Sequence, residues 1–128
     1  MEKVVGIGGV FFKARDPEAL GAWYQEVLGA DITTGIWFQE AGPTVLAPFP
    51  ESTDYFDRDT QAFMINFRVH NLDAMMDQLR ARGLTVITKE EWDSEAGRFA
   101  RIHDPEGNPI ELWQPPSPPD ESPDESSR

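Results

Sequence analysis

Alternating apolar and polar residues over positions 99–113 predict a β-hairpin. Asp104, Pro105 and Gly107 suit a type I turn followed by a left-handed residue, a conformation that Gly adopts without steric cost. A loop of this kind pairs Asp104 with Asn108 and thereby sets the register of both strands.

This register divides the hairpin into two faces. The first face is apolar and suited to covering by a helix, with Ile102 opposite Ile110 and Ala100 opposite Leu112. The second face has Phe99 opposite Trp113 and Arg101 opposite Glu111, with His103 near the turn. We expect function on this second face.

Two stretches with apolar residues at helical spacing predict amphipathic helices. The first follows the cap Asp16 and ends at Gly29, and the second follows the cap Asn71 and ends at Gly83. Their expected buried residues are Leu20, Trp23, Tyr24, Val27 and Leu28 in the first helix and Leu72, Met75, Met76 and Leu79 in the second.

Extended segments surround each helix in the same order, with one strand before it and three after it. These expected strands are 4–14, 30–34, 36–40 and 44–49 in the first half, then 61–70, 84–90 and the two strands of the hairpin. The residues themselves repeat, since VFFKARDPEAL aligns with INFRVHNLDAM. The sequence thus predicts an α+β fold of two tandem βαβββ modules, about 1–55 and 60–116, forming a curved mixed sheet around a cleft.

Composition narrows the classes of function. The net charge of −12 argues against a nucleic-acid partner and against anionic membranes, although it would favour a cationic ligand. The absence of cysteine and of any apolar run of membrane-spanning length predicts a soluble cytoplasmic protein. The last residues, 117–128, are rich in Pro, Ser and acids, which predicts a disordered tail.

Three stretches carry a resemblance to a known superfamily: GGVFFKARDPEALGAWYQEVLGA, MINFRVHNLDAMMDQLRARG and GRFARIHDPEGNPIELWQP. In this order and spacing they resemble the vicinal oxygen chelate superfamily, which includes glyoxalase I, extradiol dioxygenases and the fosfomycin- and bleomycin-resistance proteins. The resemblance covers residues 1–116 and implies a ligand cleft between the modules and a homodimer. It does not imply one reaction, because these proteins differ widely in chemistry on one scaffold.

Metal-dependent members of that superfamily hold a divalent ion with side chains from the first and last strands of each half. Carried over to this chain, the ligand positions fall at Gly9, near Val45, at Met64 and at Glu111, and Glu111 alone has a suitable side chain. A single carboxylate does not hold a catalytic ion, since such sites use three or more convergent ligands. We therefore expect no metal and no other cofactor.

Two residues are candidates for catalysis. Glu111 could act as a lone metal ligand, a general base or the anchor of a cationic ligand, and the structural alternative is a cross-strand ion pair with Arg101. His103 could act as a base or as a substitute ligand near Glu111, and the alternative is a partly exposed histidine beside a turn.

Further candidates would line the cleft and bind a ligand. Asn66 and Arg68 follow Met64 at a period of two, so the three should share a face, and Asn66 needs a hydrogen-bond partner in a ligand or a neighbour. The full set of expected ligand-binding residues is Phe11, Trp37, Met64, Asn66, Arg68, Phe99, Arg101 and Trp113. The structural alternative for the aromatic residues of this set is packing in the core.

Three functional hypotheses follow. The favoured one is a metal-independent small-molecule-binding protein of the glyoxalase/bleomycin-resistance type, with its ligand in an aromatic cleft. The alternative is a glyoxalase-like lyase or isomerase, or a dioxygenase-type enzyme, that uses Glu111 with a divalent metal. The third is a structural or regulatory domain whose cleft is closed.

Overall fold

The computed structural model describes residues 1–32 and 35–117. The chain forms two compact units, residues 1–39 and the part that begins at Glu40. The polar segment 50–60, where the two expected modules meet, therefore belongs to the second unit. The expected disordered tail lies, apart from its first residue, outside the described residues.

The first unit contains helix α1, Pro17–Leu28. As predicted, Asp16 caps it, with its carboxylate accepting from the Ala19 amide at 3.0 Å, and Gly29 ends it in the left-handed conformation at φ 74°. Leu20, Tyr24 and Val27 are its buried residues. The ring of Tyr24 contacts that of Trp23, with centroids 5.2 Å apart.

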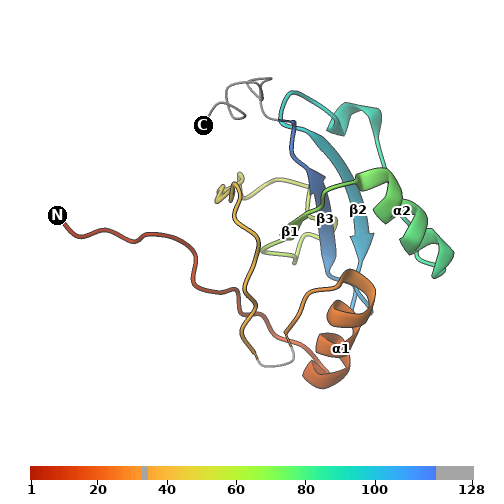
Figure 1. The fold of residues 1–128 in the computed structure, drawn as a ribbon, viewed down its shortest axis with the longest axis horizontal. Coiled ribbons are helices and arrows are strands. Elements are labelled where there is room, and N and C mark those ends of the chain that lie inside the picture. Colours follow the sequence, from red (N-terminus) through yellow and green to blue (C-terminus); the bar gives the residue numbers. More distant parts are fainter. Residues whose placement is uncertain (33–34, 118–128) are drawn as a thin grey trace, which may run out of the picture. The chain divides into compact units, whose positions relative to one another are not determined.

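The second unit is built on a three-stranded mixed sheet in the order β1-β3-β2 (Figure 1). The strands are β1 (Ile65–Arg68), β2 (Arg98–His103) and β3 (Pro109–Gln114). Central strand β3 runs parallel to β1 and antiparallel to β2. Helix α2 (Leu72–Ala81) and a short 3-10 helix (Glu90–Trp92) complete the elements.

The β2–β3 hairpin has the predicted register. Ile102 pairs with Ile110, and the turn is closed by a bond of 3.0 Å from the Asp104 amide to the Asn108 carbonyl. Gly107 has φ 86°, the left-handed conformation expected at its position. The Asp104 carboxylate, 4% exposed, accepts from the Glu106 and Asn108 amides, which fixes the turn further.

Helix α2 packs against β2 and β3, and this contact forms the core of the second unit. Asn71 caps the helix as predicted, and the Leu72 amide donates to Oε1 of Gln114 at 2.8 Å, so the helix is tied to β3 at its first turn. The buried apolar residues are Leu72, Met76, Leu79, Ala100, Ile102, Ile110 and Leu112. Met75, also expected in this core, is only half-buried.

The number of strands is smaller than predicted. The expected strands 4–14, 36–40 and 44–49 do not form, and 30–34 lies partly outside the described residues. Segment 84–90 is reduced to a single bridge between Ile87 and Arg101, and 61–70 is a strand only over 65–68. Strand propensity alone does not order an extended segment, because each strand needs a partner for its backbone and a covered face. An open α+β sheet is therefore confirmed, whereas the tandem modules remain a prediction.

Candidate functional site

The face of the sheet opposite α2 carries a row of three polar side chains, one from each strand. Asn66 on β1 pairs with Glu111 on β3, which in turn pairs with Arg101 on β2. The next row joins Arg68, Trp113 and Phe99 in the same way. The face predicted to be functional thus presents a carboxylate at its centre.

Glu111 accepts hydrogen bonds on both carboxylate oxygens. Nδ2 of Asn66 donates to Oε1 at 2.7 Å, and the hydroxyl of Tyr55 donates to Oε2. Burial, with the hydrogen bond to Glu111 and its charge, raises the pKa of Tyr55 to about 12, so Tyr55 is a neutral donor. Of the two partners foreseen for Asn66, the structure has the neighbouring side chain.

Arg101 is 3% exposed although it carries a full charge. Its guanidinium donates to Oδ1 of Asp57 at 2.6 Å and to the Tyr55 carbonyl at 2.9 Å, while Nε has no partner. The guanidinium carbon lies 4.7 Å from the Tyr55 ring centroid and 5.2 Å from that of Trp92, in cation–π geometry. The ion pair of Arg101 is therefore with Asp57 and not, as the register suggested, with Glu111.

Asp57 links Arg101 to His103. Its second oxygen lies 2.5 Å from Nε2 of His103, and its backbone has φ 75°, which is unusual for a residue other than Gly. Burial would raise the pKa of Asp57, but the hydrogen bond from His103 and the charge and hydrogen bond of Arg101 outweigh it and lower that pKa below its usual range. His103, 39% exposed beside the turn, thus bonds Asp57 and not Glu111.

Aromatic side chains surround Tyr55. Its ring stacks on Phe49, with centroids 5.9 Å apart and an angle of 13° between the planes, and meets the ring of Trp92 edge-on, also at 5.9 Å. Phe56 lies at 6.5 Å on a further side. These rings and Glu111 contact the half-buried phenol of Tyr55, and we call the space that it occupies, with apolar walls and a polar end, the slot.

The predicted stack of Phe99 and Trp113 is present. Their centroids are 6.3 Å apart and the rings are nearly parallel, at 4°. Trp113 is 8% exposed, and its indole donates to the Ala96 carbonyl at 2.8 Å. Gly97 has φ 127°, and a Cβ there would lie 2.3 Å from the Gln114 carbonyl oxygen, so the turn before β2 lies tightly against the end of β3. Trp113 is thus a buried packing residue, while Phe99 is half-buried.

The remaining predicted ligand-binding residues are distributed more widely. Arg68 donates to the Glu40 carbonyl at 3.1 Å, and Met64 is half-buried just before β1. Phe11 and Trp37 belong to the first unit, where the side chain of Phe11 is 96% exposed.

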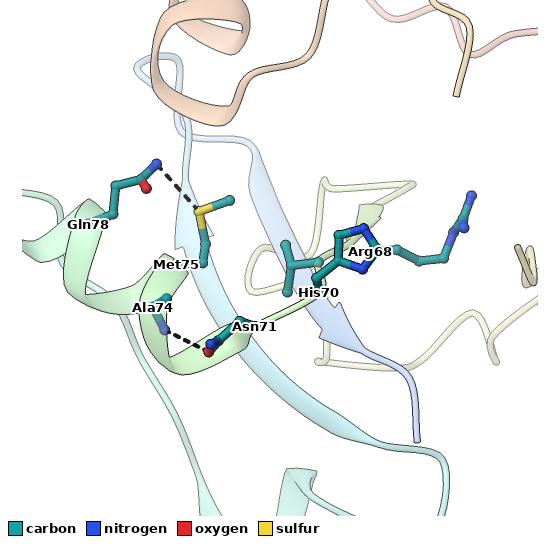
Figure 2. Close-up of a pocket in the computed structure, with 7 residues that line it drawn as sticks. Arg68, His70, Asn71, Ala74, Met75 and Gln78 are labelled. Carbon is teal, nitrogen blue, oxygen red and sulfur yellow. Dashed lines mark hydrogen bonds between the residues drawn. The ribbon is translucent and has the colours of Figure 1, made fainter. Parts of the chain in front are cut away.

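A separate open hollow of about 300 Å³ lies where β1 leads into α2 (Figure 2). It is lined by residues 68–71 and by Ala74, Met75 and Gln78. Its polar groups are already used, because Asn71 caps α2 and the exposed His70 bonds Glu40 at 2.8 Å. The hollow therefore offers less chemistry than the row around Glu111.

The arrangement does not suit a divalent metal ion. Across residues 1–32 and 35–117, no group of three or more His, Cys, Asp or Glu side chains could hold one. Both oxygens of Glu111 already accept hydrogen bonds, from Asn66 and from Tyr55. In the part of the chain that the structure describes, the residues do not fit the ion that the superfamily uses.

The site residues that come from segment 49–57 were missed in the sequence. Among them, Tyr55 and Asp57 lie in the polar, turn-rich segment 50–60. The pair Tyr55-Phe56 within an otherwise polar turn region was a usable signal, since exposed aromatic residues are costly there. Nothing in the sequence indicated that Asp57 would reach Arg101.

Comparison with known proteins identifies the family. The model of the glyoxalase-like domain matches residues 9–113. The chain belongs to the glyoxalase-like domain family. The superfamily resemblance is thereby confirmed, while a comparison with curated protein sequences gives no match.

Two solved structures share the fold of this glyoxalase-like chain at 22% sequence identity or less. TnmS3, an antibiotic-binding protein from Streptomyces sp. CB03234, has a TM-score of 0.60 and 22% identity, covering 91% of this chain and 100% of its own. The integron cassette protein VCH_CASS1, from the mobile metagenome of V. Cholerae, has a TM-score of 0.57 and 17% identity, covering 89% and 98%. These likenesses concern the fold. Within the described part of the chain, no helix is long and apolar enough to cross a membrane.

Proposed function

We propose that this glyoxalase-like protein binds a small organic molecule without a metal, on the sheet face that carries Glu111. The observation that carries the proposal is the position of the Glu111 carboxylate, between Asn66 and Arg101 in one cross-strand row. Sites for small molecules combine apolar walls with few, well-placed polar groups. The aromatic rings of Phe49 and Trp92, which flank Tyr55 beside this row, meet that description.

Two further observations support binding rather than catalysis. Arg101 and Asp57 neutralise each other, and both oxygens of Glu111 accept hydrogen bonds. These polar groups are therefore suited to holding and orienting a ligand. TnmS3, which shares the fold, is an antibiotic-binding protein, and a ligand of comparable kind is proposed for this chain.

Ligand-induced thermal stabilisation tests the proposal. A panel of metabolites and aromatic antibiotics is screened against the wild-type protein and against Glu111→Gln, with Glu95→Gln at an exposed position as the matched control. We expect compounds that raise the melting temperature of the wild type and of Glu95→Gln but stabilise Glu111→Gln less. If no compound stabilises the protein, the result would favour the third hypothesis, a structural or regulatory domain that binds no ligand.

The metal-dependent alternative makes a different prediction. An enzyme with Glu111 as a ligand would retain a stoichiometric divalent ion through purification and lose it in Glu111→Gln. Elemental analysis of both proteins measures this directly. We expect no stoichiometric ion in either protein, and its presence in the wild type alone would refute metal-independent binding.

The assembly and location expected from the sequence are part of the same proposal. We propose a homodimer in the cytoplasm, supported by the superfamily resemblance and by the absence of cysteine. Light scattering coupled to gel filtration measures the assembly. A monomer at micromolar concentration would refute the dimer without affecting the binding site.

A further inference from the structure

The side chain of Tyr55 is held as a small ligand would be. Its ring is stacked on Phe49, meets Trp92 edge-on and lies 4.7 Å from the guanidinium carbon of Arg101. Its hydroxyl reaches the carboxylate of Glu111. Every part of a phenol is therefore matched, namely the ring face, the ring edge and the polar end.

This phenol comes from a connecting segment, whereas Glu111 and Arg101 are on strands of the sheet. The segment is held independently of the Tyr55 side chain. Arg101 donates to the backbone carbonyl of Tyr55 and to the Asp57 carboxylate, and turn bonds such as that from the Thr53 amide to the Pro50 carbonyl, at 3.0 Å, shape the segment itself. Rotation about the side-chain bonds of Tyr55 would vacate the slot and leave these contacts in place.

We propose that Tyr55 occupies the ligand site of the free protein, and that the ligand is an aromatic compound with a hydroxyl group that replaces the Tyr55 phenol. This inference rests on the proposed function, because it names the ligand class of the same site. It assigns Tyr55 a second role, that of an internal competitor.

The chemistry of the slot selects a ligand that donates a hydrogen bond. Oε2 of Glu111 is the oxygen that faces the slot, and an ether or a ketone would leave it without a donor, at the cost of an unpaired polar group. A carboxylate would be repelled by Glu111. An ammonium ion would also donate to Oε2, but the group that the structure places there is a phenol, whose ring in addition fills the space between the aromatic walls. A phenolic hydroxyl meets none of these obstacles.

The test uses the full chain with Tyr55→Ala, which removes the competitor, and p-cresol, which is the missing side chain as a free molecule. The matched probe is 4-methylanisole, which has the same ring but no hydroxyl hydrogen. The double variant Tyr55→Ala/Glu111→Gln is the control for the polar end. Dissociation constants are measured by NMR titration, and melting temperatures are measured in parallel.

We expect p-cresol to bind Tyr55→Ala about tenfold more tightly than 4-methylanisole, because a hydrogen bond to a charged acceptor is worth at least one such factor. This preference should disappear in the double variant. The wild type should bind p-cresol about tenfold or more weakly than Tyr55→Ala, since a tethered competitor acts at roughly millimolar effective concentration.

Equal binding of the two probes by Tyr55→Ala, or a preference that survives Glu111→Gln, would overturn the inference. If Tyr55→Ala does not fold alone, its folded fraction is followed by circular dichroism as each probe is added. Recovery with p-cresol and not with 4-methylanisole supports the inference, and recovery with both or neither overturns it.

The result is separable from the proposed function. Wild-type stabilisation by panel compounds that lack a hydroxyl, lost in Glu111→Gln, would uphold small-molecule binding and reject this ligand class. Failure of every compound in the panel would reject the function itself.

Discussion

Arg101 and Glu111 face each other across the β2–β3 ladder, yet the guanidinium of Arg101 bonds Asp57 at 2.6 Å. The carboxylate of Glu111 is thereby left to Asn66 and Tyr55. A segment remote in sequence thus separates two charges that strand register had placed together. The consequences can be measured residue by residue.

Replacing Asp57 by Asn should destabilise the protein, because Arg101 would remain buried without its counter-charge. We expect a loss of about 1–3 kcal/mol in the free energy of unfolding, below the range for fully buried pairs since the Asp57 side chain is 35% exposed. Urea denaturation at pH 7 measures it. The neighbouring exposed change Asp59→Asn should cost under about 0.5 kcal/mol, and equal losses in the two variants would contradict the assigned role.

The ionisation of Asp57 should contribute to the loss of stability at acid pH. Its pKa is lowered in the folded state, so its contribution is present above its usual pKa and is lost as the pH falls through the lower, folded value. Urea melts below about pH 4 should therefore show a steeper loss in the wild type than in Asp57→Asn. Parallel profiles would exclude the linkage.

Tyr55→Phe isolates the phenol hydroxyl at alkaline pH. The pKa of Tyr55 is raised from 10.0 to about 12, so the folded state keeps a proton that the unfolded state loses. Stability should fall between these two values in the wild type and fall less in Tyr55→Phe. Thermal melts across this interval make the comparison. Equal falls in the two proteins would contradict the role assigned to the Tyr55 hydroxyl.

Asn66→Asp would place a second carboxylate 2.7 Å from Glu111 in place of an amide donor. Two close carboxylates resist double ionisation, so one of them should hold a proton to a higher pH than usual. The variant should be less stable than the wild type at pH 7, by about 1–2 kcal/mol, and should recover as the pH falls towards 4. A deficit independent of pH would point to packing rather than charge.

Arg101→Lys tests whether geometry or charge holds the segment. The guanidinium reaches both Asp57 and the Tyr55 carbonyl, which one ammonium group on a different stem does not reproduce. We expect a loss of about 1–2 kcal/mol in unfolding free energy. Chemical denaturation decides it, and wild-type stability in the lysine variant would show that charge alone suffices.

Local rules anticipated the elements whose causes are local. The caps Asp16 and Asn71, the left-handed Gly107 and the hairpin register depend on residues a few positions apart, and the structure has them all. The faces of the hairpin followed from the register, which is why the stack of Phe99 and Trp113 was foreseen.

Long-range pairing was less accessible. Asp57 and Arg101 are 44 positions apart, and the turn-rich composition of segment 50–60 gave no reason to place the Asp57 carboxylate on the sheet. Strand formation at 84–90 likewise depended on a partner, and Ile87 obtained one bridge only. The candidate site was thus half foreseen, with its strand residues in place and its covering segment missing.

The tight turn at Gly97 limits which residues this position can accept. A methyl group there would collide with the Gln114 carbonyl and with the indole of Trp113, at 2.3 and 2.8 Å. In a library of random variants screened only for folding, this position should remain glycine, while the exposed Glu95 nearby accepts many residues. Gly97 would then tolerate few substitutions because of a close backbone contact, although it contributes no functional group to the binding face.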